Sequence, residues 1–289
     1  MAPLTIDTKL KLNSGYEIPQ LGFGVYQTPP SDTKRCVTEA LNAGYLHVDS
    51  AAYYQNEAAC AEAIRSFGRD KVFFTSKILP GSLNYDSVIS QVDRMLKETN
   101  LGYLDLVLIH SPHGGSANRK AAWKALVECV ETGKIRSIGV SNYGVHHLDE
   151  LEKHIVELEE ERGCKGKGGV ISVGQWEIHP WVARNDIVEW CAKRNIAAEA
   201  YCPLVQGKRW GEPVLKKLAE KYGKSEAQIL IRWSLQKGLV PLPKSVTTER
   251  IKSNAEVFDF ELTPEEIAEL QTDEYSPISW DPNVEPLER

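Results

Sequence analysis

Six short apolar segments of this chain each end in a polar residue suited to catalysis or binding. Residues 45–48 are followed by Asp49 and residues 106–109 by His110, and the same pattern places four other polar residues: Lys77, Asn142, Gln175 and Lys244. If these segments are strands of one parallel barrel, all six side chains lie at the rim where such barrels hold their active sites. The pattern therefore predicts a functional site at the carboxyl ends of the strands.

Strand-like and helix-like segments alternate eight times along the chain. The strand-like segments are 20–25, 46–49, 71–76, 105–110, 135–142, 170–175, 196–201 and 239–242. The helix-like segments between and after them are 31–42, 56–66, 85–99, 118–132, 145–162, 185–194, 212–222 with 225–237, and 248–257. This alternation is typical of parallel strands with right-handed crossovers, and eight units favour a closed barrel over an open doubly wound sheet. We predict one α/β domain over residues 1–289, a (β/α)8 TIM barrel.

Two additions flank the predicted barrel. Alternating apolar residues around the turn Asn13-Ser14-Gly15 predict a β-hairpin over about residues 8–19, which we expect to close the lower end of the barrel. At the other end, Thr263, Pro264 and Glu266 form the start signal of an extra helix, because threonine caps, proline suits the first helical position and glutamate completes a capping box. The extra helix and tail span about residues 263–289.

Composition and residue spacing exclude several classes of function. A formal net charge of −6 argues against sequence-independent nucleic-acid binding, which needs a basic face. No stretch has the length of a signal peptide or a membrane span, so we expect a cytoplasmic protein, monomeric or weakly dimeric. The six cysteines include no Cys-x-x-Cys pair, and four histidines lie without partners at ligand spacing, so we predict no metal site: His113, His146, His147 and His179. The glycine-rich residues 163–169 follow a helix rather than a strand, which predicts a surface loop and not a dinucleotide-binding turn.

Four residues from neighbouring segment ends form a candidate proton-transfer group. They are Asp49, Tyr54, Lys77 and His110. Tyrosine has an ordinary pKa of about 10 and is a poor acid at neutral pH, but a nearby ammonium stabilises the phenolate and lowers that pKa. We expect Lys77 to act on Tyr54 in this way, with Asp49 orienting the lysine. His110 is placed to hydrogen-bond a carbonyl oxygen and share its developing charge.

The sequence resembles the aldo-keto reductase family nearly end to end. The matching motifs, in family order, are residues 21–24, 49–57, 76–77, 108–110, 139–142, 175–180 and 243–254. The resemblance implies a barrel with Asp49, Tyr54, Lys77 and His110 as catalytic tetrad and NADPH lying extended across the rim. It also implies that Ser141, Asn142 and Gln175 hold the nicotinamide carboxamide and that Tyr201 stacks on the ring. The remaining cofactor-binding residues that it implies are Gly24, Pro203, Leu204, Lys244, Ser245, Val246, Arg250 and Asn254.

The charges expected around the adenosine of the cofactor favour NADPH over NADH. Lys244, Ser245 and Arg250 place two cations and a hydroxyl after the last strand-like segment, where backbone N–H groups of a helix start also favour an anion. This chemistry suits a 2′-phosphate, so we predict NADPH/NADP+ over NADH. Ser253 stands where the family usually carries Glu or Gln against the adenosine, which predicts weaker binding of the cofactor.

The substrate side is expected to be aromatic and open. Tyr26, Tyr53 and Trp280 are candidates for its walls, and Ser111 stands where many relatives carry a tryptophan. The predicted function is NADPH-dependent reduction of aldehydes or ketones, including ketoesters, to alcohols, with Tyr54 as proton donor. Two alternatives remain open: a class I aldolase that uses Lys77 as a Schiff base, and a cofactor-binding regulatory protein without turnover.

Overall fold

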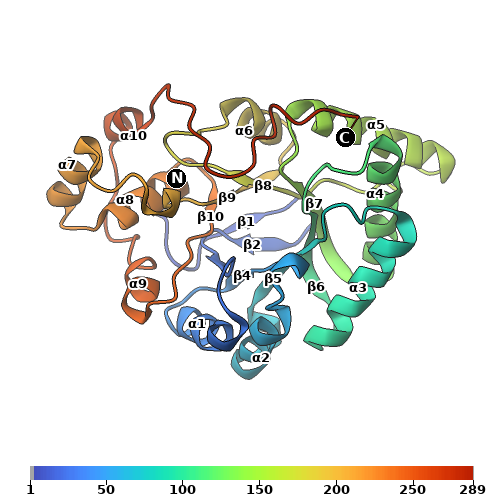
Figure 1. Cartoon of the computed structure of the whole chain (residues 1–289), viewed down its shortest axis with the longest axis horizontal. Helices are drawn as coiled ribbons and strands as arrows, with labels where there is room; N and C mark the ends of the chain where they lie inside the picture. Colours follow the sequence, from blue (N-terminus) through green and yellow to red (C-terminus); the bar gives the residue numbers. More distant parts are fainter. Residues whose placement is uncertain (1–2, 289) are drawn as a thin grey trace.

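Eight parallel strands follow one another around a barrel in the order of the sequence (Figure 1). The computed structural model describes residues 3–288. The strands are β3 (Phe23–Gly24), β4 (His47–Asp49), β5 (Phe73–Ile78), β6 (Leu104–Ile109), β7 (Ile135–Ser141), β8 (Val173–Glu177), β9 (Ala197–Tyr201) and β10 (Val240–Pro241). Backbone N–H groups of Gly22 and Gly24 donate to the carbonyls of Pro241 and Pro243, both at 3.1 Å, and so join the first strand to the last. The predicted (β/α)8 barrel is confirmed.

Glycine is required where the first and last strands meet. A Cβ atom on Gly22 would lie 2.5 Å from Leu242 and 2.6 Å from the His47 ring, and one on Gly24 would lie 3.2 Å from the Leu242 carbonyl oxygen. These separations leave little or no room for a side chain. The barrel itself therefore explains both glycines, whether or not Gly24 also admits a cofactor.

Ten α-helices surround the strands in the described part of the chain. They are α1 (Pro30–Asn42), α2 (Glu57–Phe67), α3 (Tyr85–Thr99), α4 (Ser116–Glu131), α5 (Val145–Glu161), α6 (Asn185–Ala192), α7 (Pro213–Tyr222), α8 (Glu226–Gln236), α9 (Thr248–Ser253) and α10 (Pro264–Leu270). Three single 3₁₀ turns occur at η1 (Ala52–Tyr54), η2 (Arg69–Lys71) and η3 (Val205–Gly207). None of the described helices is long and apolar enough to cross a membrane.

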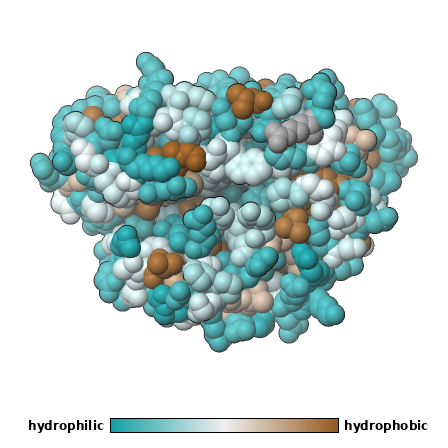
Figure 2. Space-filling view, in the orientation of Figure 1, coloured by the Kyte–Doolittle hydropathy of each residue, from teal (hydrophilic) through white to brown (hydrophobic). Residues whose placement is uncertain are grey.

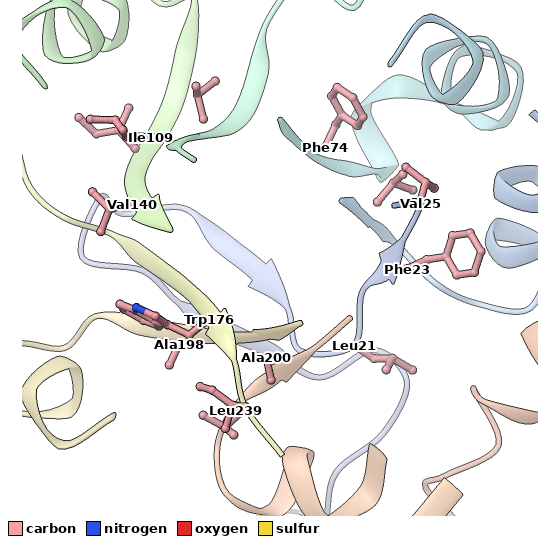
Figure 3. Packing of buried hydrophobic residues seen from close by; sticks show 14 of the residues in the cluster. Leu21, Phe23, Val25, Phe74, Ile109, Val140, Trp176, Ala198, Ala200 and Leu239 are labelled. Carbon is pink, nitrogen blue, oxygen red and sulfur yellow. The ribbon is translucent and has the colours of Figure 1, made fainter. Parts of the chain in front are cut away.

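The apolar core has two parts. The larger part fills the space between strands and helices, and Figure 3 shows Phe23 and Phe74 directed from their strands toward the surrounding helices. The smaller part closes the amino end of the barrel, where Leu12 and Ile18 of the hairpin pack on strand residues that include Phe73 and Leu106. The hairpin, β1 (Lys9–Lys11) with β2 (Glu17–Pro19), is antiparallel and confirms the prediction.

Several predicted segment ends are wrong. The strand expected over 71–76 is β5, which ends at Ile78, so Lys77 lies inside a strand and not after it. The strand expected over 170–175 is β8, which begins at Val173 and ends at Glu177, because Gly169 takes a left-handed φ of +80° and Val170 is exposed. Gln175 therefore lies inside a strand and not after it. The helix expected over 248–257 ends at Ser253. The glycine-rich loop 163–169 is mostly exposed, as predicted.

Residues 271–288, the C-terminal segment, cross the viewed face from α10 toward α5 (Figure 1). The Glu177 carboxylate accepts hydrogen bonds from the backbone N–H groups of Ile278 and Ser279, both at 2.8 Å. Farther along, the Arg119 guanidinium donates to the Leu287 carbonyl at 2.7 Å. The segment is thereby fixed to β8 near its middle and to α4 near its last described residue.

The predicted capping box at Thr263 is present, so its removal is expected to destabilise the fold. The hydroxyl of Thr263 accepts from the Glu266 N–H, and the Glu266 carboxylate accepts from the Thr263 N–H. We expect Thr263→Ala to lower the free energy of unfolding by about 1 kcal/mol, the usual effect of losing such a cap. Urea denaturation measures this change. Thr38→Ala, an exposed position inside α1, is the matched control and should show no loss; equal losses in both variants would contradict the capping role.

Candidate active site

A cavity of about 600 Å³ lies at the carboxyl ends of the strands. Asp49, Tyr54 and His110 of the predicted tetrad line it. Figure 2 shows the same face hollowed near its centre. The strands thus bring these three residues together as the position of the strand ends predicts.

Lys77 lies beneath the cavity as part of a buried ion pair. Its side chain has no exposed surface, and its ammonium donates to both Asp49 carboxylate oxygens at 2.8 and 2.7 Å and to the Ser50 carbonyl at 2.8 Å. Three acceptors match the three N–H donors of an ammonium. The Lys77 nitrogen lies 5.2 Å from the centre of the Tyr54 ring, and among the described residues Tyr54 is not one of its hydrogen-bond partners.

The electrostatics of Tyr54 differ from the expectation drawn from the sequence. Burial raises the pKa of the Tyr54 phenol well above its ordinary value, and the Asp49 charge raises it further. Burial outweighs the stabilisation of the phenolate by Lys77, because Asp49 balances the ammonium charge at hydrogen-bond distance. The Tyr54 hydroxyl is therefore protonated across the whole neutral range. The turn η1 presents its ring between Tyr26 and His110, with ring centres 5.0 and 5.8 Å away.

His110 follows β6 directly and is neutral. Burial lowers the pKa of the imidazole to about 3, and the charge of Lys77 acts in the same direction. A neutral imidazole carries a single N–H donor. Its Nδ1 atom has no hydrogen-bond partner among residues 3–288. Asn142 donates to the His110 backbone carbonyl at 3.0 Å and so ties the end of β6 to the end of β7. His110 can thus present an N–H group to an oxygen atom in the cavity.

The four residues predicted to hold the nicotinamide end all line the cavity and are connected by hydrogen bonds. The Tyr201 hydroxyl donates to the Asn142 side-chain oxygen at 2.8 Å, and the Ser141 hydroxyl donates to the Gln175 backbone carbonyl at 2.9 Å. Asn142 adopts a left-handed backbone with φ of +61°, a conformation that β-branched residues avoid. Their polar groups are therefore oriented in advance.

The remaining predicted cofactor residues divide into two groups. Gly24, Pro203, Leu204 and Lys244 line the cavity. The other four do not line this cavity, so the predicted cofactor residues do not all lie in one pocket: Ser245, Val246, Arg250 and Asn254. Arg250 is exposed and donates to the Thr247 hydroxyl at 2.7 Å. Arg35 of α1 donates to the Val246 carbonyl at 3.1 Å, which adds a cation that no local motif indicates.

Three of the four predicted substrate residues line the cavity: Tyr26, Tyr53 and Trp280. Ser111 does not. It is fully buried, and its hydroxyl pairs with His113 Nδ1 at 3.3 Å. The structure thus places Ser111 behind the cavity wall, and its contact with a substrate stays a prediction. The ring of His113 packs on Trp280 with centres 5.1 Å apart, so Ser111 is connected to that wall through His113.

Several residues at the site escape the sequence patterns. The cavity is also lined by Gln27, Pro80, Cys202, Gln206, Leu242, Ile278 and Ser279. Most of these are apolar or lie in loops. Glu199 lies deeper, under Gln175, and here a signal exists: it is the only charged residue in the otherwise apolar strand Ala197–Tyr201.

Comparisons with known proteins identify the family. Residues 20–272 match the Aldo/keto reductase family. An uncharacterized oxidoreductase of Schizosaccharomyces pombe is 42% identical over 285 residues, or 96% of this chain and 98% of that one. Glyoxal reductase of Bacillus subtilis is 37% identical over 93% of each chain. The crystal structure of a Bombyx mori aldo-keto reductase in complex with NADP superposes with a TM-score of 0.80 at 29% identity, over 93% of each chain. The chain belongs to the aldo/keto reductase family.

Proposed function

We propose that this protein reduces aldehydes or ketones, including ketoesters, to alcohols with NADPH, and that Tyr54 donates the proton. The observation that carries the proposal is the grouping of a protonated Tyr54 and a neutral His110 over the buried Lys77–Asp49 pair, at one cavity. A panel of aldehydes, ketones, ketoesters and sugars tests it by loss of reduced-nicotinamide absorbance. No consumption with any of them would favour a binding protein without turnover.

The residues around the cavity fit a nicotinamide cofactor. Ser141, Asn142 and Gln175 offer hydroxyl and amide groups for a carboxamide, and the half-buried Tyr201 offers a ring face. The cations Lys244 and Arg250 suit a 2′-phosphate. The NADP complex of the Bombyx mori relative supports this cofactor. When bound, NADPH would supply the hydride for the carbonyl carbon.

The chain's own residues act on the carbonyl oxygen. His110 donates its N–H to that oxygen and orients it, which stabilises charge that develops there. Tyr54 then delivers its proton to the same oxygen as general acid. The ammonium of Lys77, 5.2 Å from the Tyr54 ring centre, stabilises the phenolate that remains. The apolar contribution of Trp280, Tyr53 and Tyr26 to the cavity favours carbonyl substrates with an apolar substituent.

The aldolase alternative is less well supported. A Schiff base needs a lysine nitrogen that reaches the substrate and loses its charge. Lys77 has no exposed surface, and its nitrogen is held by three acceptors. Borohydride treatment with a carbonyl substrate should therefore trap no adduct on Lys77.

Replacing Tyr54 with phenylalanine is expected to lower kcat by about 10²–10⁴-fold, because the general acid is lost. NADPH affinity should stay nearly unchanged. Steady-state kinetics and cofactor fluorescence titration measure the two effects. Tyr16→Phe, an exposed residue outside the cavity lining, is the control and should behave as the parent; full turnover in Tyr54→Phe would remove Tyr54 from this role.

Replacing Arg250 with alanine is expected to weaken NADPH binding by about 1.5–3 kcal/mol, the usual contribution of a hydrogen bond to a charged group. NADH binding should not change, since it lacks the 2′-phosphate. Isothermal titration of both cofactors measures the difference. The neighbouring exposed Lys252→Ala is the matched control; equal affinity of the parent protein for NADH and NADPH would refute the assignment.

A further inference from the structure

A second buried carboxyl group lies directly under the active site. Glu199 of β9 has no exposed surface. Its Oε2 atom accepts a hydrogen bond of 2.7 Å from the Gln175 side-chain amide. The same amide nitrogen donates to Asp49 Oδ2 at 2.9 Å. One amide therefore bridges the carboxyl groups of Glu199 and Asp49 inside the barrel.

The bonding of the two carboxyl groups is unequal. The Asp49 carboxylate receives two hydrogen bonds from the Lys77 ammonium and one from Gln175. Among the described residues, Glu199 accepts a hydrogen bond only from Gln175. Its Oε1 atom lies 3.4 Å from Nε2 of His47 and makes no aligned hydrogen bond within residues 3–288. A buried carboxylate oxygen without a donor is unfavourable, whereas a protonated oxygen in this place can donate to an imidazole nitrogen.

The charges around Glu199 also favour the protonated form of its carboxyl group. Asp49 and His47 face Glu199 from β4. From β5, the Lys77 ammonium pairs with Asp49, and the Thr75 hydroxyl lies 3.0 Å from His47 Nε2, the nitrogen that also faces Glu199. Strand β10 (Val240–Pro241) contributes no titratable side chain. Burial lowers the pKa of His47 to about 3, so its imidazole is neutral. One ammonium thus stands against two carboxyl groups, and only one of them can be ionised without leaving an unbalanced buried charge.

We propose that Glu199 is a positioning residue that stores a proton beneath the active site, directed from Oε1 toward His47, and so keeps Lys77 and Asp49 a balanced pair under Tyr54. Its catalytic consequence rests on the proposed function, in which Tyr54 is the proton donor. Ionisation of Glu199 adds a second negative charge near Asp49. That charge opposes the phenolate and the alkoxide-like oxygen that form during reduction, so turnover falls.

The pH at which this happens follows from the surroundings. Burial and the Asp49 charge raise the pKa of Glu199 to about 8 from an ordinary value of 4.5. The folded protein therefore holds the proton more tightly than the unfolded chain. The stabilisation that this proton contributes is complete below about pH 4.5 and is lost as pH rises through about 8. Tyr54 titrates far above this range, so a decline near pH 8 does not belong to it.

The test compares Glu199→Gln with the parent protein. Glutamine keeps the size of the side chain and cannot ionise. Glu220→Gln, at an exposed position in α7, is the matched control. In the parent and the control, kcat/KM should fall about tenfold between neutral pH and about pH 9.5, as for one added charge at intermediate distance. In Glu199→Gln this decline should be absent. An unchanged decline in Glu199→Gln would overturn the proposal.

A second measurement needs no turnover. The unfolding midpoint of the parent should fall relative to that of Glu199→Gln as pH rises from about 5 to 8, by the linkage above. The opposite trend would mean that Glu199 is ionised in the fold and would overturn the proposal. A protein that reduces no carbonyl would refute the proposed function alone, since this measurement still reports the proton on Glu199.

Infrared spectroscopy covers the case in which Glu199→Gln does not fold. The parent protein should then show a protonated carboxylic acid C=O band that disappears with a midpoint near the pKa of about 8. The absence of a band with that midpoint would overturn the proposal.

Discussion

The site depends on one ion pair, between Lys77 and Asp49, held inside the barrel. Burial of an ammonium and a carboxylate is unfavourable by several kcal/mol for each ion unless every donor and acceptor is satisfied. Here the Ser50 carbonyl and the Gln175 amide complete the set. These partners come from β4, β5 and β8 and the turn after β4, so the pair forms only when the strands adopt their register. The geometry of the Lys77–Asp49 pair therefore depends on the closure of the barrel.

The pairing also determines what kind of acid Tyr54 is. An ammonium alone beside a phenol would make it a stronger acid, which is the expectation from the residue types. With Asp49 bonded to that ammonium, the net charge near Tyr54 is close to zero, and burial dominates. Tyr54 therefore holds its proton firmly. Under the proposed function, proton transfer from Tyr54 requires an acceptor oxygen that is becoming strongly basic, and little of that proton passes to water when no substrate is present.

Much of the architecture could be predicted from the sequence because it depends on local residue patterns. The alternation of strands and helices, the hairpin and the capping box at Thr263 all follow from periodicity and turn chemistry. The start of β8 could not be predicted, because the apolar residues Val170 and Ile171 continue a strand-like pattern across a segment where Gly169 has already turned the chain. Likewise, the helix after β10 ends at Ser253, although the pattern predicts it to residue 257.

The site divides in the same way. Residues at strand ends, such as Asp49 and His110, were predictable because the barrel gathers strand ends at one rim. Ser111 is buried and Arg250 lies outside the cavity lining because of the way the loops turn. The spacing of residues in the sequence does not predict such turns. The pattern of strand ends does not include Glu199, because this residue lies in the middle of β9 and its carboxyl group lies one layer deeper. Three-body contacts such as Asp49, Gln175 and Glu199 exist only after folding.

The C-terminal segment supplies part of the cavity through Ile278, Ser279 and Trp280, although it contains no strand or helix among its described residues. Its attachment points, Glu177 and Arg184, belong to the barrel and bind its backbone at Ile278, Ser279 and Trp280. The bonds to Ile278, Ser279 and Trp280 are made by main-chain groups, whereas Tyr275 and Asp281 are held by Arg184 through their side chains. Substitutions at the three positions that line the cavity therefore keep these main-chain bonds, and under the proposed function they can alter the substrate wall while Tyr54, Lys77 and Asp49 stay in place.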